Sequence, residues 1–178
     1  SAIGMDFGMK SYLTLSNGQE IKSPEFLKQN LKLIQSLNKA FSKKRKCSNN
    51  RKKALNKLQK VHNDVFNKRT DFEWKLAHEL CKHNSFIAIE DLNLEAMKKL
   101  WGRKISDLSF SSFVNKLGQV ALKYNTVLQK VDRYYASSKT CSCGVKNKEL
   151  KLSEREWVCS SCGTVHQRDL LASNNILS

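Results

Sequence analysis

Proline and glycine are scarce in this chain, and long apolar runs are absent. The 178 residues include one proline, Pro24, and seven glycines, which argues against a protein built mainly of loops. No apolar run approaches the ~20 residues that a membrane-spanning helix needs. Residues 1–10 lack the basic flank and apolar stretch of a signal peptide. With an ordinary apolar content of 40%, we expect a globular cytoplasmic protein with no membrane partner.

Acidic residues are also few, and one long segment has none. The chain carries 32 Lys and Arg against 16 Asp and Glu, a net charge of +16, which favours a polyanionic partner. From Phe26 to Asn63 there is no acidic residue, but there are twelve Lys or Arg. A solvated helix face usually mixes both signs, so this segment predicts a surface that contacts nucleic-acid phosphates. The densest cations are Lys43, Lys44, Arg45, Lys46, Arg51, Lys52 and Lys53.

The spacing of apolar residues predicts strands followed by a helical hairpin. Residues 2–22 alternate like strands, and an Asn-Gly pair within them indicates a tight hairpin turn. We expect Ser23 to cap a helix that has Pro24 in its first position. Two helical patterns separated by a polar break predict an antiparallel helical hairpin with a basic tip over about residues 24–83.

Beyond the hairpin, strand and helix patterns alternate. Phe86–Ile89 is a short apolar run that predicts a strand buried on both faces, and 127–131 is a second candidate strand. Leu92–Ser109 is predicted to be a loop with a short helix. Longer helices are predicted over about 113–124 and from Arg168. This order indicates a mixed α/β layer fold, and an RNase H-like fold is the interpretation that we prefer.

Three carboxylates stand in positions that suit a metal-dependent nuclease. Asp6 lies in an apolar strand between two glycines, Glu90 ends the most apolar strand, and Asp169 lies in the first turn of the last helix. Mg²⁺ and Mn²⁺ prefer oxygen ligands, and such ions can activate water and stabilise the leaving oxygen in phosphodiester hydrolysis. The residues therefore predict a catalytic metal site.

Each of these carboxylates also has an ordinary structural explanation. Asp6 could pair with a lysine, Glu90 could form an ion pair at a strand end, and Asp169 could be an acid favoured by the helix dipole. Asp91 is an alternative ligand to Glu90, because strand alternation lets only one of the two face the site. The residues alone leave these alternatives open.

Four cysteines predict a second, structural metal site. Cys141 and Cys143 form a C-x-C pair, and Cys159 and Cys162 form a C-x₂-C pair. Two pairs of thiolates suit tetrahedral Zn²⁺, and a zinc ribbon is the interpretation that we prefer. His166 is an alternative fourth ligand, and four free thiols are the other alternative.

The order of these motifs resembles that of the TnpB family, which consists of transposon-encoded nucleases related to the type V CRISPR effectors. Gly4–Gly8 is similar to the family's first RuvC motif, Ile87–Leu92 to the second, and His166–Ile176 to the third. Val131–Cys141 resembles the family's lead-in to its zinc element. The resemblance covers nearly the whole chain, but it corresponds only to the C-terminal half of the family.

The resemblance implies a domain order and an active site. A RuvC-like nuclease core would span residues 1–136 and carry the hairpin, with a zinc ribbon over 137–165 and the core's last helix over 166–178. The catalytic metal ligands would be Asp6, Glu90 and Asp169. The sequence departs from the family in its C-x-C pair, where C-x₂-C is usual, and in Leu171, where Asn is usual.

The resemblance also implies partners. The chain would belong to a nucleoid-associated, RNA-guided DNA endonuclease of a transposon, acting on single-stranded or unwound DNA, with guide RNA bound in the complete protein. Arg168 would contact the nucleic acid near the scissile phosphate. Two alternatives remain: a nuclease-dead, zinc-ribbon regulator that binds nucleic acid, and a transposase with strand-transfer activity.

Overall fold

The described part of the chain divides into two compact units. A computed structural model describes residues 1–132, 134–151 and 153–178, with only the backbone of Leu94 and Arg103. Arg133, in the segment that resembles the lead-in to the zinc element, lies outside the described residues. One unit comprises residues 1–23 and 77–178, and the other comprises residues 24–76.

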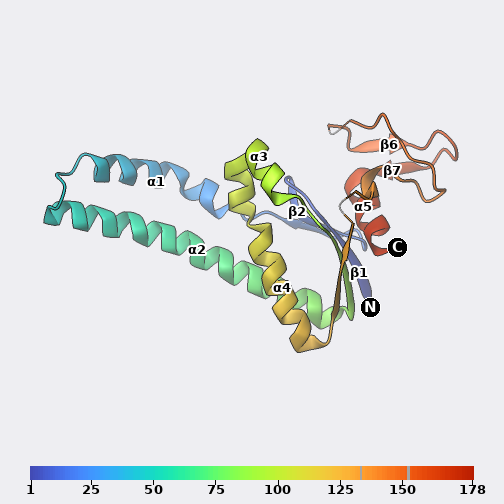
Figure 1. Ribbon diagram of the computed structural model, residues 1–178, viewed down its shortest axis with the longest axis horizontal. Coiled ribbons are helices and arrows are strands. Elements are labelled where there is room, and N and C mark those ends of the chain that lie inside the picture. Colours follow the sequence, from blue (N-terminus) through green and yellow to red (C-terminus); the bar gives the residue numbers. More distant parts are fainter. Residues whose placement is uncertain (133, 152) are drawn as a thin grey trace. The chain divides into compact units, whose positions relative to one another are not determined.

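The first unit is built around a five-stranded mixed sheet with the order β3-β2-β1-β4-β5 (Figure 1). The strands are β1 (Ala2–Phe7), β2 (Ser11–Leu15), β3 (Glu20–Lys22), β4 (Phe86–Glu90) and β5 (Val127–Val131). β1, β2 and β3 pair antiparallel, whereas β4 is parallel to both β1 and β5. The predicted strands are confirmed, and Gly18 occupies the predicted hairpin turn with φ of +87°.

Two helices of this unit pack on opposite faces of the sheet. α4 (Phe110–Tyr124) packs its buried Phe110 against Phe7 of β1, with ring centroids 4.9 Å apart. α5 (Arg168–Leu177) crosses β1 at Gly4, where a Cβ atom would lie 2.1 Å from the carbonyl oxygen of Ser173. Because side chains alternate between faces along a strand, Gly4 and Phe7 face opposite ways. Both helices were predicted, and both are confirmed.

The segment Leu92–Ser109 was predicted to be a loop with a short helix, and this prediction is wrong. Residues Leu94–Leu108 form the 15-residue helix α3. Asn93 caps its N-terminus by accepting a hydrogen bond from the backbone N–H of Ala96 at 3.1 Å. The helix deviates from regular geometry at Trp101, where φ is −131°. A single helical period therefore could not describe the segment.

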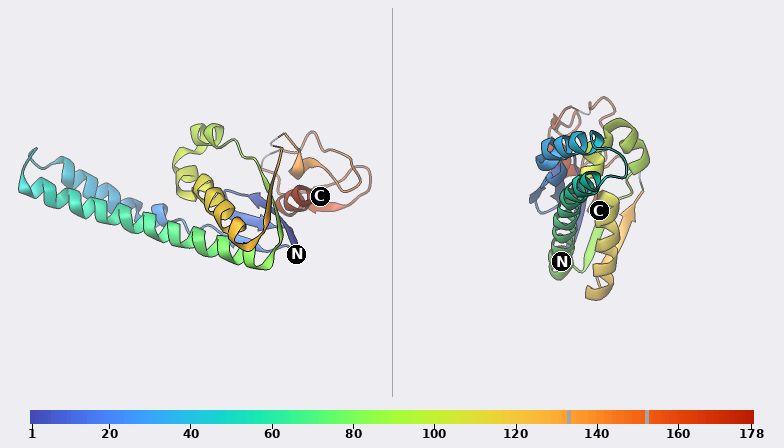
Figure 2. Two further views of the ribbon diagram at one scale, coloured as in Figure 1. Left: turned by 60° about the horizontal axis from the view of Figure 1, so that its bottom comes forward. Right: turned by 90° about the vertical axis from the view of Figure 1, so that its left-hand side faces the viewer.

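The second unit is the predicted helical hairpin. α1 (Phe26–Ser42) runs alongside the first part of α2 (Asn49–His83), as Figures 1 and 2 show. The buried apolar residues Ile34, Leu58 and Val65 lie between the two helices. None of the helices within the described ranges has the length and apolarity needed to cross a bilayer.

The start of the hairpin differs from the prediction. α1 begins at Phe26 rather than at Pro24, because Glu25 adopts a left-handed conformation with φ of 47°. The ring of Phe26 then packs edge-on against Phe72 of α2, with centroids 6.4 Å apart. This aromatic contact fixes the first turn of the helix in place of a Ser23 cap.

Candidate active site and metal centre

Asp6 and Glu90 stand side by side at the ends of two parallel strands. The β1–β4 register runs from Ala2 opposite Phe86 to Met5 opposite Ile89, so the next step places Asp6 opposite Glu90. Residues paired in this way point to the same face of a sheet. The two carboxylates therefore share the α5 face. Because side chains alternate between the two faces along a strand, the side chain of Asp91, the alternative ligand, points to the opposite face of the sheet.

Helix α5 carries Asp169 to the same place. Ser173 lies against Gly4, and Asp169 precedes Ser173 by four residues, about one helical turn or 6 Å along the helix. Asp6 follows Gly4 by two residues, about 6.6 Å along the strand. Because these distances along α5 and along β1 are nearly equal, the Asp169 side chain lies beside Asp6. The structure thus gathers all three predicted carboxylates at one end of the sheet.

The electrostatics of the site agree with this arrangement. Burial, then the negative charges of Glu90 and Asp169, raise the pKa of Asp6 to about 8, against the opposing effect of Arg168 and Arg155. Burial also raises the pKa of Glu90, with a smaller contribution from the neighbouring Asp91 charge. Such crowded, desolvated carboxylates are stable as anions only beside a cation. Their oxygen atoms fit a hard divalent ion.

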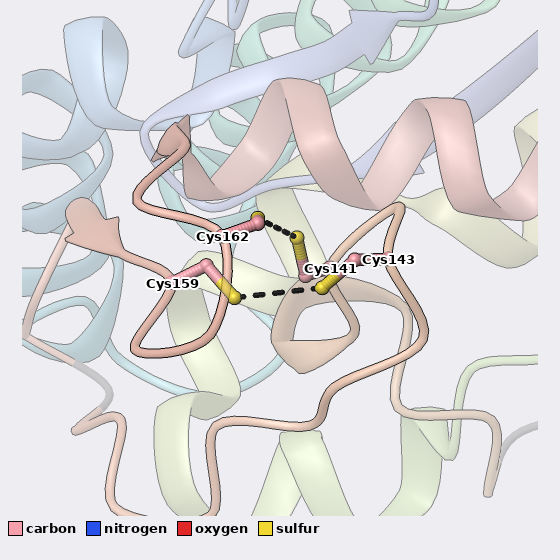
Figure 3. A group of neighbouring side chains, drawn as sticks. All are labelled: Cys141, Cys143, Cys159 and Cys162. Carbon is pink, nitrogen blue, oxygen red and sulfur yellow. Dashed lines mark hydrogen bonds between the residues drawn. The ribbon is translucent and has the colours of Figure 1, made fainter.

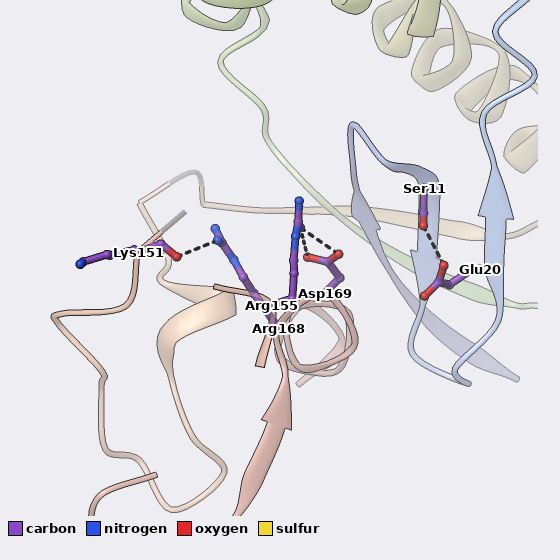
Figure 4. A network of polar contacts seen from close by, with 6 residues as sticks. All are labelled: Ser11, Glu20, Lys151, Arg155, Arg168 and Asp169. Carbon is purple, nitrogen blue, oxygen red and sulfur yellow. Dashed lines mark hydrogen bonds and ion pairs between the residues drawn. The ribbon is translucent and has the colours of Figure 1, made fainter. Parts of the chain in front are cut away.

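Arg155 is a site residue that the sequence analysis did not identify. Its Nη1 atom lies 3.2 Å from both Oδ1 and Oδ2 of Asp169 (Figure 4). Arg155 directly precedes β6 (Glu156–Val158), which pairs with β7 (Val165–Gln167). The register of this hairpin places Arg155 beside the residues that start α5. A predicted hairpin with the second cysteine pair in its loop would have revealed this proximity.

Arg168 is turned toward the ribbon. Its backbone N–H donates to the Arg155 carbonyl oxygen at 2.7 Å, and its Nη1 donates to the Lys151 carbonyl oxygen at 3.4 Å (Figure 4). These bonds join the beginning of α5 to the ribbon segment. A contact of Arg168 with the nucleic acid stays a prediction.

The four predicted cysteines converge on one point. Their sulfur atoms all lie within 4.8 Å of one another, and the pairs Cys141–Cys162 and Cys143–Cys159 are each 3.6 Å apart (Figure 3). A tetrahedral ion with Zn–S bonds near 2.3 Å requires sulfurs about 3.8 Å apart. The sulfurs are too far apart for disulfides. The short C-x-C spacing therefore does not prevent the cluster from holding a metal ion such as zinc.

His166 supports this cluster from its edge. Its Nε2 atom lies 3.0 Å from the sulfur of Cys141, and its ring packs against that of Trp157 with centroids 4.8 Å apart. The four sulfurs form the group without His166. The geometry thus favours His166 as a hydrogen-bonding neighbour of Cys141 over a fourth ligand.

The ribbon and α5 share a small hydrophobic core. Leu171 of α5 is buried in one cluster with Cys141, Leu150, Trp157 and Cys159. Nearby, Asn175 of α5 donates hydrogen bonds to two ribbon carbonyl oxygens at 2.7 Å each. Leu171, the position where the resemblance leads one to expect Asn, therefore fastens the ribbon to the helix that carries Asp169.

The predicted phosphate-binding cluster lies at the hairpin tip. Its lysines and Arg45 are exposed, whereas Arg51 is used within the hairpin. The Arg51 guanidinium lies 4.0 Å from the centroid of the Phe41 ring, and it donates to the carbonyl oxygens of Phe41 and Lys44. Arg51 thus holds the turn between the helices, and contacts of the cluster with phosphates stay a prediction.

Comparison with known proteins identifies the family. The OrfB_IS605 family model, described as a probable transposase, matches residues 1–100, more than half of the chain. The chain belongs to this family, that of the TnpB proteins. A second family model, the TNB domain of Cas12f1-like proteins, matches residues 110–176, which include the four cysteines and Asp169.

Several relatives of this TnpB-family chain carry names that refer to the same group. A protein of Streptomyces pristinaespiralis, named as a candidate RNA-guided DNA endonuclease, is 36% identical over 181 residues, covering 100% of this chain and 45% of its own length. The TnpB-like protein L79 of Acanthamoeba polyphaga mimivirus is 34% identical over 194 residues, covering 99% of this chain and 37% of its own length. The chain thus spans less than half the length of these relatives.

A solved structure shares the fold. The match is a chain in the cryo-EM structure of the Cas12f1–sgRNA–target DNA complex, with a TM-score of 0.67 and 18% sequence identity. It covers 99% of the TnpB-family chain and 49% of the Cas12f1-complex chain. The mixed sheet, the helices around it and the cysteine-bearing segment are therefore an arrangement that occurs in a known structure.

Proposed function

We propose that this chain is the nuclease part of a transposon-associated, RNA-guided DNA endonuclease, and that Asp6, Glu90 and Asp169 form its active site. One observation carries the proposal: three carboxylates converge at the ends of parallel strands in a protein with a net charge of +16. Negative charge would repel phosphates, so a protein that only binds nucleic acid gains nothing from this cluster. A nuclease needs it to hold metal ions.

The fold supports the same proposal. Three antiparallel strands followed by two parallel ones, with helices on both faces, suit the RNase H-like, RuvC-like class. In such a sheet the carboxyl ends of the central strands meet at one edge, where Asp6 and Glu90 lie. The relatives named as RNA-guided DNA endonucleases suggest the substrate and the guide.

Asp6 and Glu90 would hold a catalytic Mg²⁺ or Mn²⁺ from two neighbouring strands, and Asp169 would hold it from α5. An ion bound by these residues would supply an activated water and would stabilise the leaving oxygen of the phosphodiester. Arg155 offsets the charge of Asp169 and orients it, while Arg168, which donates to the Lys151 carbonyl oxygen, joins the start of α5 to the ribbon segment. The four cysteines would hold a structural Zn²⁺, which would keep the ribbon against α5.

A cavity of about 230 Å³ lies at the end of β4, on the side of the sheet that α4 covers. Its lining includes Glu90, Asp91, Ser111, Asn115 and Lys130, together with apolar residues such as Phe7 and Phe110. The polar groups among these residues suit a sugar–phosphate backbone that passes the end of the strand. Single-stranded or unwound DNA can reach such a site, since its backbone is flexible enough to follow a polar groove.

Cleavage of a labelled strand by matched variants tests the proposal. We would incubate the zinc-loaded chain with end-labelled single-stranded DNA and Mn²⁺, beside Glu90→Gln and Asp91→Asn. We expect cleavage by the parent and by Asp91→Asn, and a loss of at least a hundredfold in Glu90→Gln. The reverse pattern would make Asp91 the ligand.

Two other outcomes point to other functions. A folded parent that binds DNA and leaves it intact would favour a nuclease-dead regulator. The OrfB_IS605 description as a probable transposase favours strand transfer as a second candidate. Joining of the labelled end to an added duplex would support that candidate, and its absence alongside cleavage would leave hydrolysis.

A further inference from the structure

The cavity at the end of β4 has an apolar floor and a polar rim. Phe7 and Phe110, which line it, are buried, and their rings meet edge-on with centroids 4.9 Å apart. Ser111, Asn115 and Lys130 also line the cavity, and these three residues are exposed. The cavity therefore combines aromatic surface inside with hydrogen-bonding groups at its opening. We call it the β4-end cavity.

The volume of the β4-end cavity limits what it can hold. A volume of about 230 Å³ is several times the roughly 30 Å³ that one water molecule occupies in the liquid. It is smaller than the roughly 300–1,000 Å³ of pockets that enclose a drug-sized ligand. The cavity therefore suits a single ring-sized group.

Charge at the rim gives a phosphate no reason to enter. Both Glu90 and Asp91 line the cavity, and Lys130 is the only cation among the described residues of its lining. Even when Glu90 is engaged by a metal ion, Asp91 offsets the charge of Lys130, so a phosphate gains no net attraction there. The backbone of a DNA strand therefore stays outside the cavity, and the group that enters is neutral.

A nucleobase has edges that this rim can satisfy. Carboxylates accept hydrogen bonds from exocyclic amino groups, as Asp and Glu do with cytosine. The Asn115 amide both donates and accepts, so it can pair with two neighbouring groups on a base edge. The flat face of the base would rest on the aromatic floor, in a contact that every base can make. An unstacked base therefore matches both parts of the cavity.

The β4-end cavity adjoins the proposed active site without coinciding with it. Glu90 belongs to both, whereas Asp6 and Asp169 are not among the described residues that line the cavity. The carboxylates share the α5 face of the sheet, and the cavity lies on the face that α4 covers. A strand that crosses the end of the sheet can thus present a phosphate to the carboxylates and a neighbouring base to the cavity.

A second cavity continues this path along the start of α4. It has a volume of about 280 Å³ and shares Phe110 and Ser111 with the β4-end cavity. Its described lining adds Lys98 and three further serines, but no carboxylate. A lysine with several hydroxyl groups suits a phosphate. The backbone beside the bound base would therefore pass Lys98.

We propose that the β4-end cavity binds one unstacked nucleobase of the DNA strand, next to the phosphate that is cleaved. Phe7 and Phe110 contact the face of the base, and Asn115 bonds to its edge, which makes Asn115 a specificity-determining residue. The inference rests on the proposed function and deepens it, because a base held in the cavity determines which phosphate reaches Glu90.

Equilibrium binding of two short single strands tests this inference. One carries bases, and the other has the same sugars and phosphates without bases. We would use the zinc-loaded chain without Mg²⁺ or Mn²⁺, so that no cleavage is needed. The parent should bind the base-containing strand at least tenfold more tightly than the abasic strand. Val114→Trp, which places a large side chain in the cavity lining, should lower this ratio about tenfold and leave the affinity for the abasic strand unchanged.

Three further variants separate base recognition from other effects. Gln119→Trp adds the same side chain at an exposed position of α4 outside the cavity, and it should keep the parental ratio. Asn115→Ala favours the helix, so it should fold like the parent, yet lower the ratio about two- to tenfold. It should also reduce the differences in affinity among strands of the four bases. Lys98→Ala should weaken both strands equally, because it removes a phosphate contact.

The position of the cut gives a second readout. In a longer strand with one abasic site, the parent in Mn²⁺ should cut poorly at one fixed distance from that site, where the cavity would receive no base. Val114→Trp should lack this gap. An unchanged binding ratio in both Val114→Trp and Asn115→Ala would overturn the inference, whatever cleavage shows. The expected binding ratios in a chain that leaves DNA intact would instead support the base site and count against the nuclease function.

Discussion

A single guanidinium nitrogen of Arg155 lies 3.2 Å from each carboxylate oxygen of Asp169. Arg155 belongs to the segment between the two cysteine pairs, so the cysteine-bearing segment supplies a cation to the proposed active site. The arginine side chain is half exposed, so the pair adds well under about 1 kcal/mol to stability. The main effect of the ion pair is on the position of the Asp169 carboxylate.

Replacing Arg155 should therefore affect activity more than folding. We expect Arg155→Ala to cleave DNA at least tenfold more slowly, because Asp169 loses its orientation and the crowded carboxylates lose a neutralising charge. Arg155→Lys should keep part of the activity, since it keeps the charge but not the planar group. Cleavage rates over a range of Mn²⁺ concentrations measure this, with Lys148→Ala as an exposed ribbon control. Full activity of Arg155→Ala would contradict the role.

The titration of Asp6 predicts a dependence of stability on pH. Burial, then Glu90 and Asp169, raise the pKa of Asp6 from 3.8 to about 8 in the folded protein. Between these values the folded chain keeps a proton that the unfolded chain has released, so the free energy of unfolding falls as pH rises from about 4 to about 8. Asp6→Asn cannot titrate and should lack this part of the fall. Without divalent ions, the melting temperature of Asp6→Asn should therefore rise relative to that of the parent as the pH increases toward 8.

A metal ion should reverse this trend. Mn²⁺ binds the ionised carboxylate and takes the place of the proton, so it should raise the melting temperature of the parent most at high pH. Asp6→Asn should respond much less. If the melting temperatures of the two proteins depend on pH in the same way, both with and without Mn²⁺, then Asp6 does not titrate as proposed.

The ends of buried strands were the most predictable part of the candidate site. Asp6 and Glu90 could be identified because a carboxylate at the end of an apolar run has few explanations, and the parallel register then places them together. Arg155 could not be identified, because its position depends on a β6–β7 hairpin of three residues per strand. Such short strands carry too little alternation to show a register.

Helix boundaries were less predictable than helix existence. The sequence signals at Ser23 and Pro24 are those of a helix start, yet the aromatic contact between Phe26 and Phe72 determines where α1 begins. Similarly, the departure from helical geometry at Trp101 divides α3, so no single helical period runs through the segment. In both cases the local sequence preference does not show where the regular helix begins or is interrupted.

Gly4 is a sensitive point, because α5 rests directly on it. A Cβ atom there would lie 2.1 Å from the Ser173 carbonyl oxygen and 2.9 Å from the Leu177 Cβ, so Gly4→Ala must push α5 away. We expect a melting temperature lower by several degrees and a large loss of cleavage, since Asp169 moves with the helix. Gly102→Ala is the matched control, because beyond its own helix turn no atom of the described residues lies within 4 Å of its Cβ position. That variant should be at least as stable as the parent. Equal behaviour of the two variants would contradict the close packing.

Removal of a metal ion from the four cysteines should lower the cleavage rate, because the ribbon then no longer supports α5, which carries Asp169. The neighbours of Cys162 favour its thiolate form: hydrogen bonds from the hydroxyl and backbone N–H of Thr164, with smaller effects of Cys141 and Cys159, lower the pKa of Cys162 to about 6. Without the metal, the cluster of Trp157 and Leu171 loses the two cysteines that anchor it, and the ribbon no longer holds Arg155 beside Asp169. Chelation should therefore lower both the melting temperature and the cleavage rate in Mn²⁺.

Selective substitutions distinguish this indirect effect from a general loss of thiols. Cys162→Ser should bind less zinc, melt lower and cleave more slowly, whereas Cys47→Ser, in the exposed hairpin turn, should match the parent in all three. Re-addition of zinc to the chelated parent should restore cleavage, because the carboxylates and the fold of the sheet are intact. A chelated chain that still cleaves at the full rate would mean that α5 holds Asp169 without the ribbon. In that case Gly4 and the sheet alone would position the helix, and the coupling through Leu171 would be unnecessary.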